Sequence, residues 1–181
     1  MQRETGRVFD EYLVLLVVAG DKGAAERLAR RWQPRLIATA RRLLRDEEQA
    51  RTAVQQAWVS ILRGLGRLRD PASFGPWAFG ILHRRCADHI RAEQRRRGRE
   101  APEPPDAAIP APGTAADERA AIIAAFDALP PDQRFAAHLF YVEGFSLNEI
   151  ARAANWPEGT VKSRLFHARR QLKAALSGDE S

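Results

Sequence analysis

Apolar residues recur at helical spacing along most of the chain, which predicts an all-α protein. Four apolar runs lie in the first half, over residues 8–19, 22–44, 46–65 and 76–97. Gly20-Asp21 separates the first two runs, and Pro34 predicts a kink or break in the second. Residues 67–75 are expected to form a loop, and Pro76 then stands in a first helical turn, where proline is tolerated.

The third run has a clear apolar face, which indicates the side of that helix that is buried. Its inward positions are Ala50, Val54, Ala57, Trp58, Ile61 and Leu62. Asp46, Glu47 and Glu48 stand before this face. Because acids favour the positive end of a helix dipole, the helix is expected to begin there.

Residues 98–117 differ from the runs on either side, because Pro, Ala, Gly and acids dominate and no apolar periodicity remains. This composition predicts a flexible linker between two small helical domains. The negative charge of its acids would allow the segment to lie in a basic channel, but a disordered spacer is the simpler interpretation. We therefore expect domains at 1–97 and 118–176 and a tail at 177–181.

After the linker, helices are expected over residues 118–128 and 132–142, and then a helix pair between residues 144 and 172. Ser146 is a good N-cap, and Glu149 three residues later completes a capping box. Asn155 stands where the chain must reverse, and asparagine tolerates the left-handed conformation that a short turn requires.

The second helix of this pair combines a buried stripe with a basic outer face. Pro157 and Gly159 stop the preceding helix, and Thr160 is the expected cap of the next one. The stripe consists of Val161, Leu165, Ala168 and Leu172, at helical spacing. The positions left outward are Lys162, Ser163, Arg164, Phe166, His167, Arg169 and Arg170. This pattern is typical of a helix-turn-helix that reads a DNA major groove; a helical hairpin with a solvated basic face is the alternative.

The charge balance also favours a polyanionic partner. The formal net charge is +6, and lysine occurs at only three positions, so arginine supplies nearly all of the positive charge. The planar fork of arginine suits phosphate and base-edge contacts. An arginine-rich codon usage in a GC-rich genome is the alternative explanation.

One segment concentrates these arginines beside aromatic residues. The arginines are Arg84, Arg85, Arg91, Arg95, Arg96, Arg97 and Arg99, against Asp88 and Glu93, and the nearby aromatic residues are Phe74, Trp77 and Phe79. Single-stranded DNA binding requires such a basic groove with stacking platforms. Core packing explains Phe74 and Trp77 equally well, whereas a merely solvated helix end explains the arginines less well, because like charges repel one another.

The sequence gives no catalytic or cofactor motif, so we expect no enzyme activity, cofactor or metal. His83, Cys86 and His89 could share one helix face, but without a fourth ligand a small buried cysteine is the better interpretation. A lone cysteine excludes a disulfide framework and fits a reducing compartment. No apolar run is long enough to span a membrane, and we expect a cytoplasmic protein.

With these motifs in view, the run LPPDQRFAAHLFYVEGFSLNEIARAANWPEGTVKSRLFHARRQLKAAL resembles region 4 of the extracytoplasmic-function (ECF) class of bacterial RNA polymerase sigma factors. The upstream segments RLIATARRLLRD, VQQAW and SFGPWAFGILHRRCADHIR resemble region 2 of the same family, with Phe74, Trp77 and Asp88 in matching places.

The resemblance implies a sigma factor that binds RNA polymerase core, through the β′ clamp and the β flap, and promoter DNA. It implies a −35 reader at Thr160, Lys162, Ser163, Arg164, Phe166, His167, Arg169 and Arg170. It implies −10 recognition and melting by Arg69, Ser73, Phe74, Trp77, Arg84, Arg85, His89 and Arg91. It implies core polymerase contacts at Asp46, Val54, Gln55, Trp58 and Ile61.

The third helix departs from the family pattern. Where the family usually has D-A-E-D-L-V-Q-E, this chain has QARTAVQQ over residues 49–56, so three acids are missing and one arginine is added. Two consequences are open: a weaker contact with the clamp, or a contact that uses the acids at 46–48 instead. Arg84 likewise stands where the family usually has Asn.

Two other functions remain as alternatives. A sigma-like adaptor or decoy would bind an anti-sigma partner without productive initiation, and the altered third helix motivates it. A free-standing helix-turn-helix repressor would leave the first half of the chain without a role. An anti-sigma factor is also a candidate partner of a true sigma factor.

Overall fold

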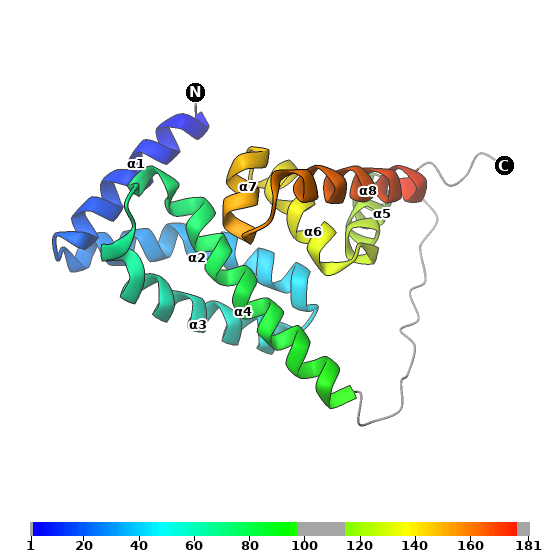
Figure 1. The fold of residues 1–181 in the computed structure, drawn as a ribbon, viewed down its shortest axis with the longest axis horizontal. Helices are drawn as coiled ribbons and strands as arrows, with labels where there is room; N and C mark the ends of the chain where they lie inside the picture. The colour runs from blue at the N-terminus through cyan, green and yellow to red at the C-terminus, as the bar shows by residue number, and fades with distance from the viewer. Residues whose placement is uncertain (1, 98–114, 177–181) are drawn as a thin grey trace. The chain divides into compact units, whose positions relative to one another are not determined.

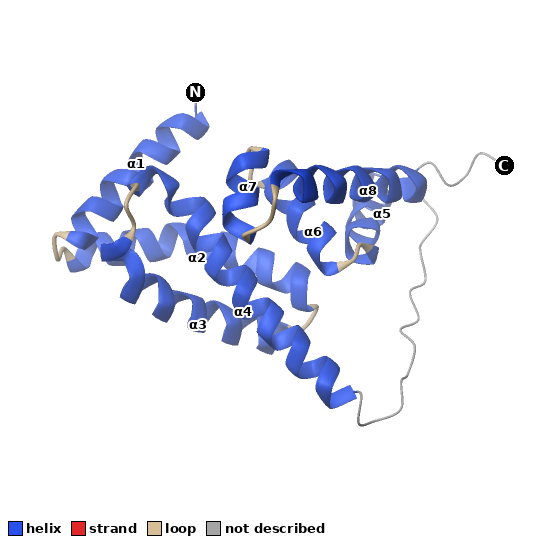
Figure 2. Ribbon diagram, viewed as in Figure 1, coloured by secondary structure: helices blue, strands red, loops and turns tan. Residues whose placement is uncertain are grey.

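The computed structural model describes residues 2–97 and 115–176, and every regular element within these ranges is a helix (Figures 1 and 2). The chain forms two compact units, the first built mainly from the helices before residue 98 and the second mainly from those after residue 114. This confirms the expected all-α fold with two small helical domains. Most of the expected linker, residues 98–114, and the expected tail at 177–181 lie outside the described residues.

In the first unit, α1 (Gln2–Val18) packs on α2 (Lys22–Leu44), and α2 packs on α3 (Glu47–Gly64). Trp32 of α2 is at the centre of the core, with its ring edge-on to Phe74 at 5.1 Å and to Phe79 at 5.8 Å between centroids. Both phenylalanines belong to α4 (Phe74–Arg97), so this aromatic cluster joins α4 to α2. Such edge-on pairs stabilise a core beyond their buried area.

The first helix begins at Gln2 and not at residue 8, so its expected start is wrong. Of the kink or break expected at Pro34, the break is wrong, because α2 continues through Pro34. Proline removes one hydrogen bond to the carbonyl four residues earlier, here Arg30. Pro34 and Arg30 are both exposed, so water can satisfy that carbonyl and the helix can continue.

The third helix begins where its acids predict. Asp46 is the N-cap of α3, and its side chain accepts a hydrogen bond from Gln49 N at 2.8 Å. Arg45, which ends α2, has a φ of 58°, a left-handed conformation that lets the chain reverse within two residues. The inward assignment of Leu62 is wrong, however, because 54% of this residue is exposed.

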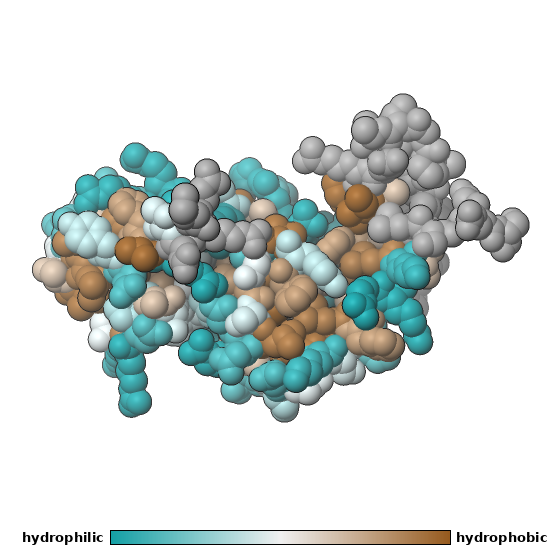
Figure 3. All heavy atoms as spheres, turned by 90° about the horizontal axis from the view of Figure 1, so that it is seen from above, coloured by the Kyte–Doolittle hydropathy of each residue, from teal (hydrophilic) through white to brown (hydrophobic). Residues whose placement is uncertain are grey.

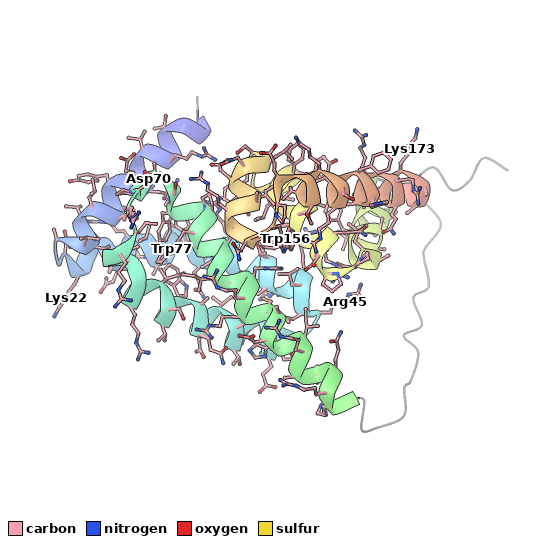
Figure 4. The ribbon with its side chains drawn as sticks, in the orientation of Figure 1. Lys22, Arg45, Asp70, Trp77, Trp156 and Lys173 are labelled. Atoms are coloured by element: carbon pink, nitrogen blue, oxygen red, sulfur yellow. The ribbon has the colours of Figure 1, made fainter. Side chains whose placement is uncertain are left out.

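The expected loop between α3 and α4 contains two short 3₁₀ turns, η1 (Leu65–Arg67) and η2 (Pro71–Ser73). Asp70 accepts a hydrogen bond from Ala72 N at 3.1 Å and caps η2. Figure 4 labels Asp70 in this loop and Trp77 near the start of α4. The helix begins at Phe74, earlier than expected, which still leaves Pro76 within its first turn.

The second unit contains α5 (Ala115–Ala128), α6 (Pro131–Ala137), α7 (Leu147–Ala154) and α8 (Glu158–Leu176). Helices α5 and α6 both pack on α8. The helix expected over 132–142 is α6 followed by one turn of π-helix, η3 (His138–Val142). Helix α5 begins at residue 115, so the expected linker ends three residues too late, at 117.

A buried arginine holds α5 and α6 together. Arg134 is only 3% exposed, and its guanidinium donates to the carbonyls of Phe126 at 3.2 Å, Asp127 at 2.5 Å and Leu129 at 2.6 Å. These carbonyls lie at the C-terminal end of α5, where helical partners are lacking and the dipole favours a cation. Arg134 therefore caps α5 from within α6.

We predict that Arg134→Ala lowers the free energy of unfolding of the second unit by about 3 kcal/mol, because it removes a buried guanidinium and three carbonyls lose their donor. Hydrogen–deuterium exchange of α5 and α6 peptides, followed by mass spectrometry, measures this loss. Arg170→Ala, an exposed position on α8, is the control and should change by less than about 0.5 kcal/mol. Unchanged protection of α5 in Arg134→Ala would contradict the capping role.

Candidate nucleic-acid interface

The helix pair α7–α8 begins with the capping box that the sequence predicts. Ser146 N donates to Glu149 Oε2 at 2.8 Å, and Glu149 N donates to Ser146 Oγ at 3.3 Å. Asn155 has a φ of 56° and reverses the chain between the helices. Trp156 N then donates to Ala151 O at 3.0 Å, which closes the end of α7. The two helices are thus joined by a short, hydrogen-bonded turn.

Helix α8 begins at Glu158, so the expectation that Thr160 caps it is wrong. The carbonyl of Pro157 accepts from Thr160 N at 2.9 Å and from Val161 N at 3.2 Å, which are first-turn bonds. Gly159 is therefore part of the helix and does not precede it. Thr160 lies in the first turn and is partly exposed.

Helix α8 buries the predicted stripe and exposes most of the predicted outer face. Val161, Leu165 and Ala168 are buried, and Leu172 is partly buried. The exposed residues of the predicted face are Lys162, Ser163, Phe166, His167, Arg169 and Arg170. Together they present ammonium, hydroxyl, aromatic, imidazole and guanidinium groups, which can donate to base edges, contact methyl groups and neutralise phosphates.

Within this face, the side chains make only light contacts with the protein. Lys162 Nζ lies 3.0 Å from Glu158 Oε1, but both side chains are about half exposed, so the pair is weak. Phe166 is 54% exposed, and its ring meets His167 edge-on at 5.5 Å between centroids. These groups can reach a ligand at little cost to the fold.

Arg164 was expected to point outward with them and does not. Its side chain is 26% exposed, its Nη2 donates to Asp132 Oδ2 at 2.7 Å, and its guanidinium lies 3.7 Å from the centroid of the Trp156 ring. Figure 4 labels Trp156 in the turn before α8. Arg164 is thus engaged within the second unit.

The residues expected to contact the −10 strand divide into three groups. Arg69, Arg84 and Arg91 are exposed; Ser73, Trp77, Arg85 and His89 are partly exposed; Phe74 is only 1% exposed. Because Phe74 packs edge-on against Trp32, core packing explains it and base stacking does not. Arg85 Nη2 donates to Ser60 Oγ at 2.8 Å and ties α4 to α3, so Arg84 is the more accessible of the adjacent pair.

Trp77 is the remaining aromatic candidate for stacking. Its ring lies 6.2 Å from that of Phe74 and rests over Gly64 at the end of α3. A Cβ at Gly64 would come within 3.0 Å of the Trp77 ring, so glycine leaves room for the indole there. The sequence ranked core packing and stacking equally for this residue, and its partial exposure is compatible with both.

The residues expected to contact core polymerase do not share one surface. Val54 and Ile61 are fully buried, Asp46 caps α3, and Trp58 is partly exposed and donates to Gln33 Oε1. Gln55 is exposed. On the same outer face, sequence reasoning missed Val59, which is 48% exposed, and Leu62. Their i, i+4, i+7 spacing from Gln55 could have revealed this face once Asp46 had fixed the start of the helix.

Two charged residues of α3, Glu47 and Arg51, are paired with each other. Glu47 accepts from Arg41 Nη2 at 2.6 Å and from Arg51 Nε at 2.8 Å. The hydrogen bond from Arg41, followed by that from Arg51, holds the pKa of Glu47 below its ordinary value despite some desolvation. The added Arg51 of the altered motif therefore binds an acid of its own helix. Of the three acids proposed as alternative contacts, Glu47 is bound to arginines and Asp46 to a backbone amide.

In the part of the chain that the structure describes, no group of three or more His, Cys, Asp and Glu side chains is arranged to hold a metal ion. His83, Cys86 and His89 therefore do not form such a group. Nor is any described helix both long enough and apolar enough to cross a membrane.

Comparison with known proteins gives consistent matches for both units. Residues 28–96 match the family model of sigma-70 region 2, and residues 119–172 match that of sigma-70 region 4. The chain is 36% identical to the ECF RNA polymerase sigma factor SigM of Mycobacterium tuberculosis, over 92% of this chain and 84% of the relative. It is 30% identical to the RNA polymerase sigma-H factor of Pseudomonas aeruginosa, over 92% and 93% of the two chains.

A solved structure is similar over both units as well. The sigma factor RpoE of Bartonella quintana, crystallised with the anti-sigma factor NepR, matches with a TM-score of 0.64 and 26% identity. The match covers 86% of this chain and 98% of that one.

We predict that Cys86 is inert in the folded protein, because burial raises the pKa of its thiol from 9.0 to about 12. Iodoacetamide at pH 8 should label it slowly in buffer and fast in urea. Since the unfolded chain releases the proton near pH 9.0 and the folded chain near 12, the contribution of Cys86 to stability should be lost between these values. Equal labelling rates in buffer and in urea would show that the thiol is accessible.

Proposed function

This chain belongs to the ECF family of RNA polymerase sigma factors, and we propose how its two units divide the work of promoter recognition. As a sigma factor it binds RNA polymerase core and directs it to promoters to initiate transcription. The observation that carries the proposal is the capped helix pair α7–α8, which exposes Lys162, Ser163, Phe166 and His167 from one face of α8.

We assign −35 duplex recognition to this face of α8. Lys162 can donate to guanine O6 or N7, Ser163 can bond to a base or a phosphate, and Phe166 can pack on a thymine methyl. His167 lies beside Phe166 on the exposed side. Arg169 and Arg170 are further along the helix, where it leaves the groove, so they bind phosphate and carry no sequence information.

We assign the −10 strand to the first unit, with Arg84 and Arg91 of α4 and Arg69 of the preceding loop as backbone contacts. All three are exposed, as phosphate contacts require. Trp77 is the stacking candidate, because Phe74 is held in the core. Arg85 acts mainly by holding α4 to α3 through Ser60.

We assign the contact with the polymerase clamp to the outer face of α3, formed by Gln55, Val59 and Leu62. Figure 3 is seen from above and so views the side of the first unit away from α3, where hydrophobic residues also reach the surface among hydrophilic ones. Large apolar side chains exposed together mark interaction sites. Since Val59 and Leu62 are each about half exposed, this face can bury apolar area without refolding. The β flap would then contact the second unit.

An anti-sigma factor is the second candidate partner, because the similar structure of RpoE was solved with one bound. Helix α1 offers a further apolar surface, through Val8, Tyr12, Leu15 and Val18, each more than half exposed. A decoy that binds an anti-sigma factor without initiating transcription would use the same surfaces. We expect the sigma factor to act in the cytoplasm, where the polymerase is.

Run-off transcription with purified core polymerase and fragmented genomic DNA tests these functions together. Specific transcripts that require this chain support the sigma assignment and map its promoters. Core binding without transcripts would support the decoy. DNA binding without core binding would support a repressor and contradict both.

We predict that Leu62→Ser weakens core binding by about 1–2 kcal/mol, because it removes an exposed apolar contact from the α3 face. Fluorescence anisotropy of the labelled sigma factor titrated with core polymerase measures the affinity. Leu15→Ser on α1, where the leucine is 52% exposed, is a matched control and should leave the affinity unchanged. Equal losses in the two variants would mean that the α3 face has no special role.

We predict that Lys162→Ala costs about 1–3 kcal/mol on the cognate −35 duplex and relaxes the preference at one base pair. Arg170→Ala should instead weaken binding to cognate and scrambled duplexes alike, because phosphate contacts carry no sequence information. The affinities of the holoenzyme variants for both duplexes show whether Lys162 recognises sequence and whether Arg170 binds phosphate. Equal loss in Lys162→Ala on both duplexes, or a loss confined to the cognate duplex in Arg170→Ala, would reverse the assignment.

A further inference from the structure

Arg164 lies in the middle of the proposed recognition helix but contacts the protein. Its neighbours Ser163 and Phe166 are exposed, whereas its own side chain is only 26% exposed. We propose that Arg164 is a positioning residue, which holds α8 against α6 and the turn before α8, and that it does not bind DNA. This inference rests on the proposed role of α8 as the duplex reader.

The guanidinium of Arg164 contacts the protein through both its edge and its flat face. Nη2 donates to Asp132 Oδ2 at 2.7 Å, a short charge-assisted hydrogen bond. The flat face lies 3.7 Å from the centroid of the Trp156 ring, well within cation–π range. Nη1 is shielded from solvent and makes no hydrogen bond to the described residues. Reaching a phosphate would require Arg164 to give up both contacts.

The partners of Arg164 are themselves fixed, so the cluster joins three elements. Asp132 lies in the first turn of α6, a helix that packs directly on α8. Trp156 belongs to the turn after α7, and its ring meets Phe135 of α6 edge-on at 6.1 Å between centroids. Arg164 therefore links α8 to a turn and a helix that are already in contact with each other.

This link constrains the rotation of α8 about its own axis. Val161, Leu165 and Ala168 are buried under the helix, but a stripe of small and aliphatic side chains sets rotation only loosely. A planar group held at its edge and its face sets it more tightly. Because Lys162, Ser163 and Phe166 project from the same two turns, rotation of α8 would move all of them relative to the bases.

The charges make this proposal distinguishable from direct contact with DNA. An arginine that neutralises a phosphate steepens the salt dependence of binding by about 0.9 in the log–log slope. A positioning arginine leaves this slope unchanged. Asp132→Asn raises the net charge by one, so electrostatics alone predicts tighter DNA binding. Loss of positioning predicts weaker binding instead.

The test measures holoenzyme binding to a duplex that carries the −35 element of a promoter mapped by run-off transcription. We expect Arg164→Met and Asp132→Asn each to weaken binding about five- to tenfold with the slope unchanged, as loss of one charged hydrogen bond implies. The double variant should be no weaker than either single variant, because both remove the same contact. Arg169→Ala is the control and should lower the slope by about 0.9.

Three results would overturn the proposal. They are a reduced salt slope in Arg164→Met, tighter or unchanged binding in Asp132→Asn, and additive losses in the double variant. None of them would affect the assignment of sigma function, since that rests on transcripts. Conversely, a chain that yields no transcripts fails the proposed function before this test begins.

Discussion

The second unit depends on the buried guanidinium of Arg134. Helix α6 has only seven residues, so neither α6 nor the end of α5 is stable without tertiary contacts. Arg134 supplies donors to three carbonyls at the end of α5. Because α5 and α6 both pack on α8, this one side chain fixes the surface on which the recognition helix rests.

Arginine has two roles in this protein, and composition cannot separate them. Arg134, Arg164 and Arg85 each donate to a group inside their own unit. Arg84 and Arg170 are exposed and remain available to phosphates. A net charge of +6 therefore indicates a polyanionic partner but overstates how many cations can reach it. The electrostatic part of DNA binding should come from a small set of exposed arginines on α4 and α8.

The features that the sequence predicted well depend on neighbours along the chain. The capping box at Ser146, the left-handed Asn155 and the stripe beginning at Val161 each follow from spacing and backbone preference. Arg164 and Phe74 were harder, because a basic or aromatic residue fits both a core and a DNA surface, and the choice depends on partners distant in sequence. Asp132 is 32 residues from Arg164, and Trp32 is further still from Phe74 along the chain.

In α3, too, spacing along the chain did not show which residues are buried and which can meet a partner. Missing acids suggested a weaker clamp contact, but the structure places Val54 and Ile61 in the core and turns Val59 and Leu62 outward. Since Arg51 is bound to Glu47, the substitution adds less free positive charge than the sequence implies. The outer face around Gln55 then includes the exposed apolar side chains of Val59 and Leu62. An interface of this kind gains affinity from burial more than from charge, so core binding through α3 should depend weakly on salt, whereas promoter binding depends on it strongly.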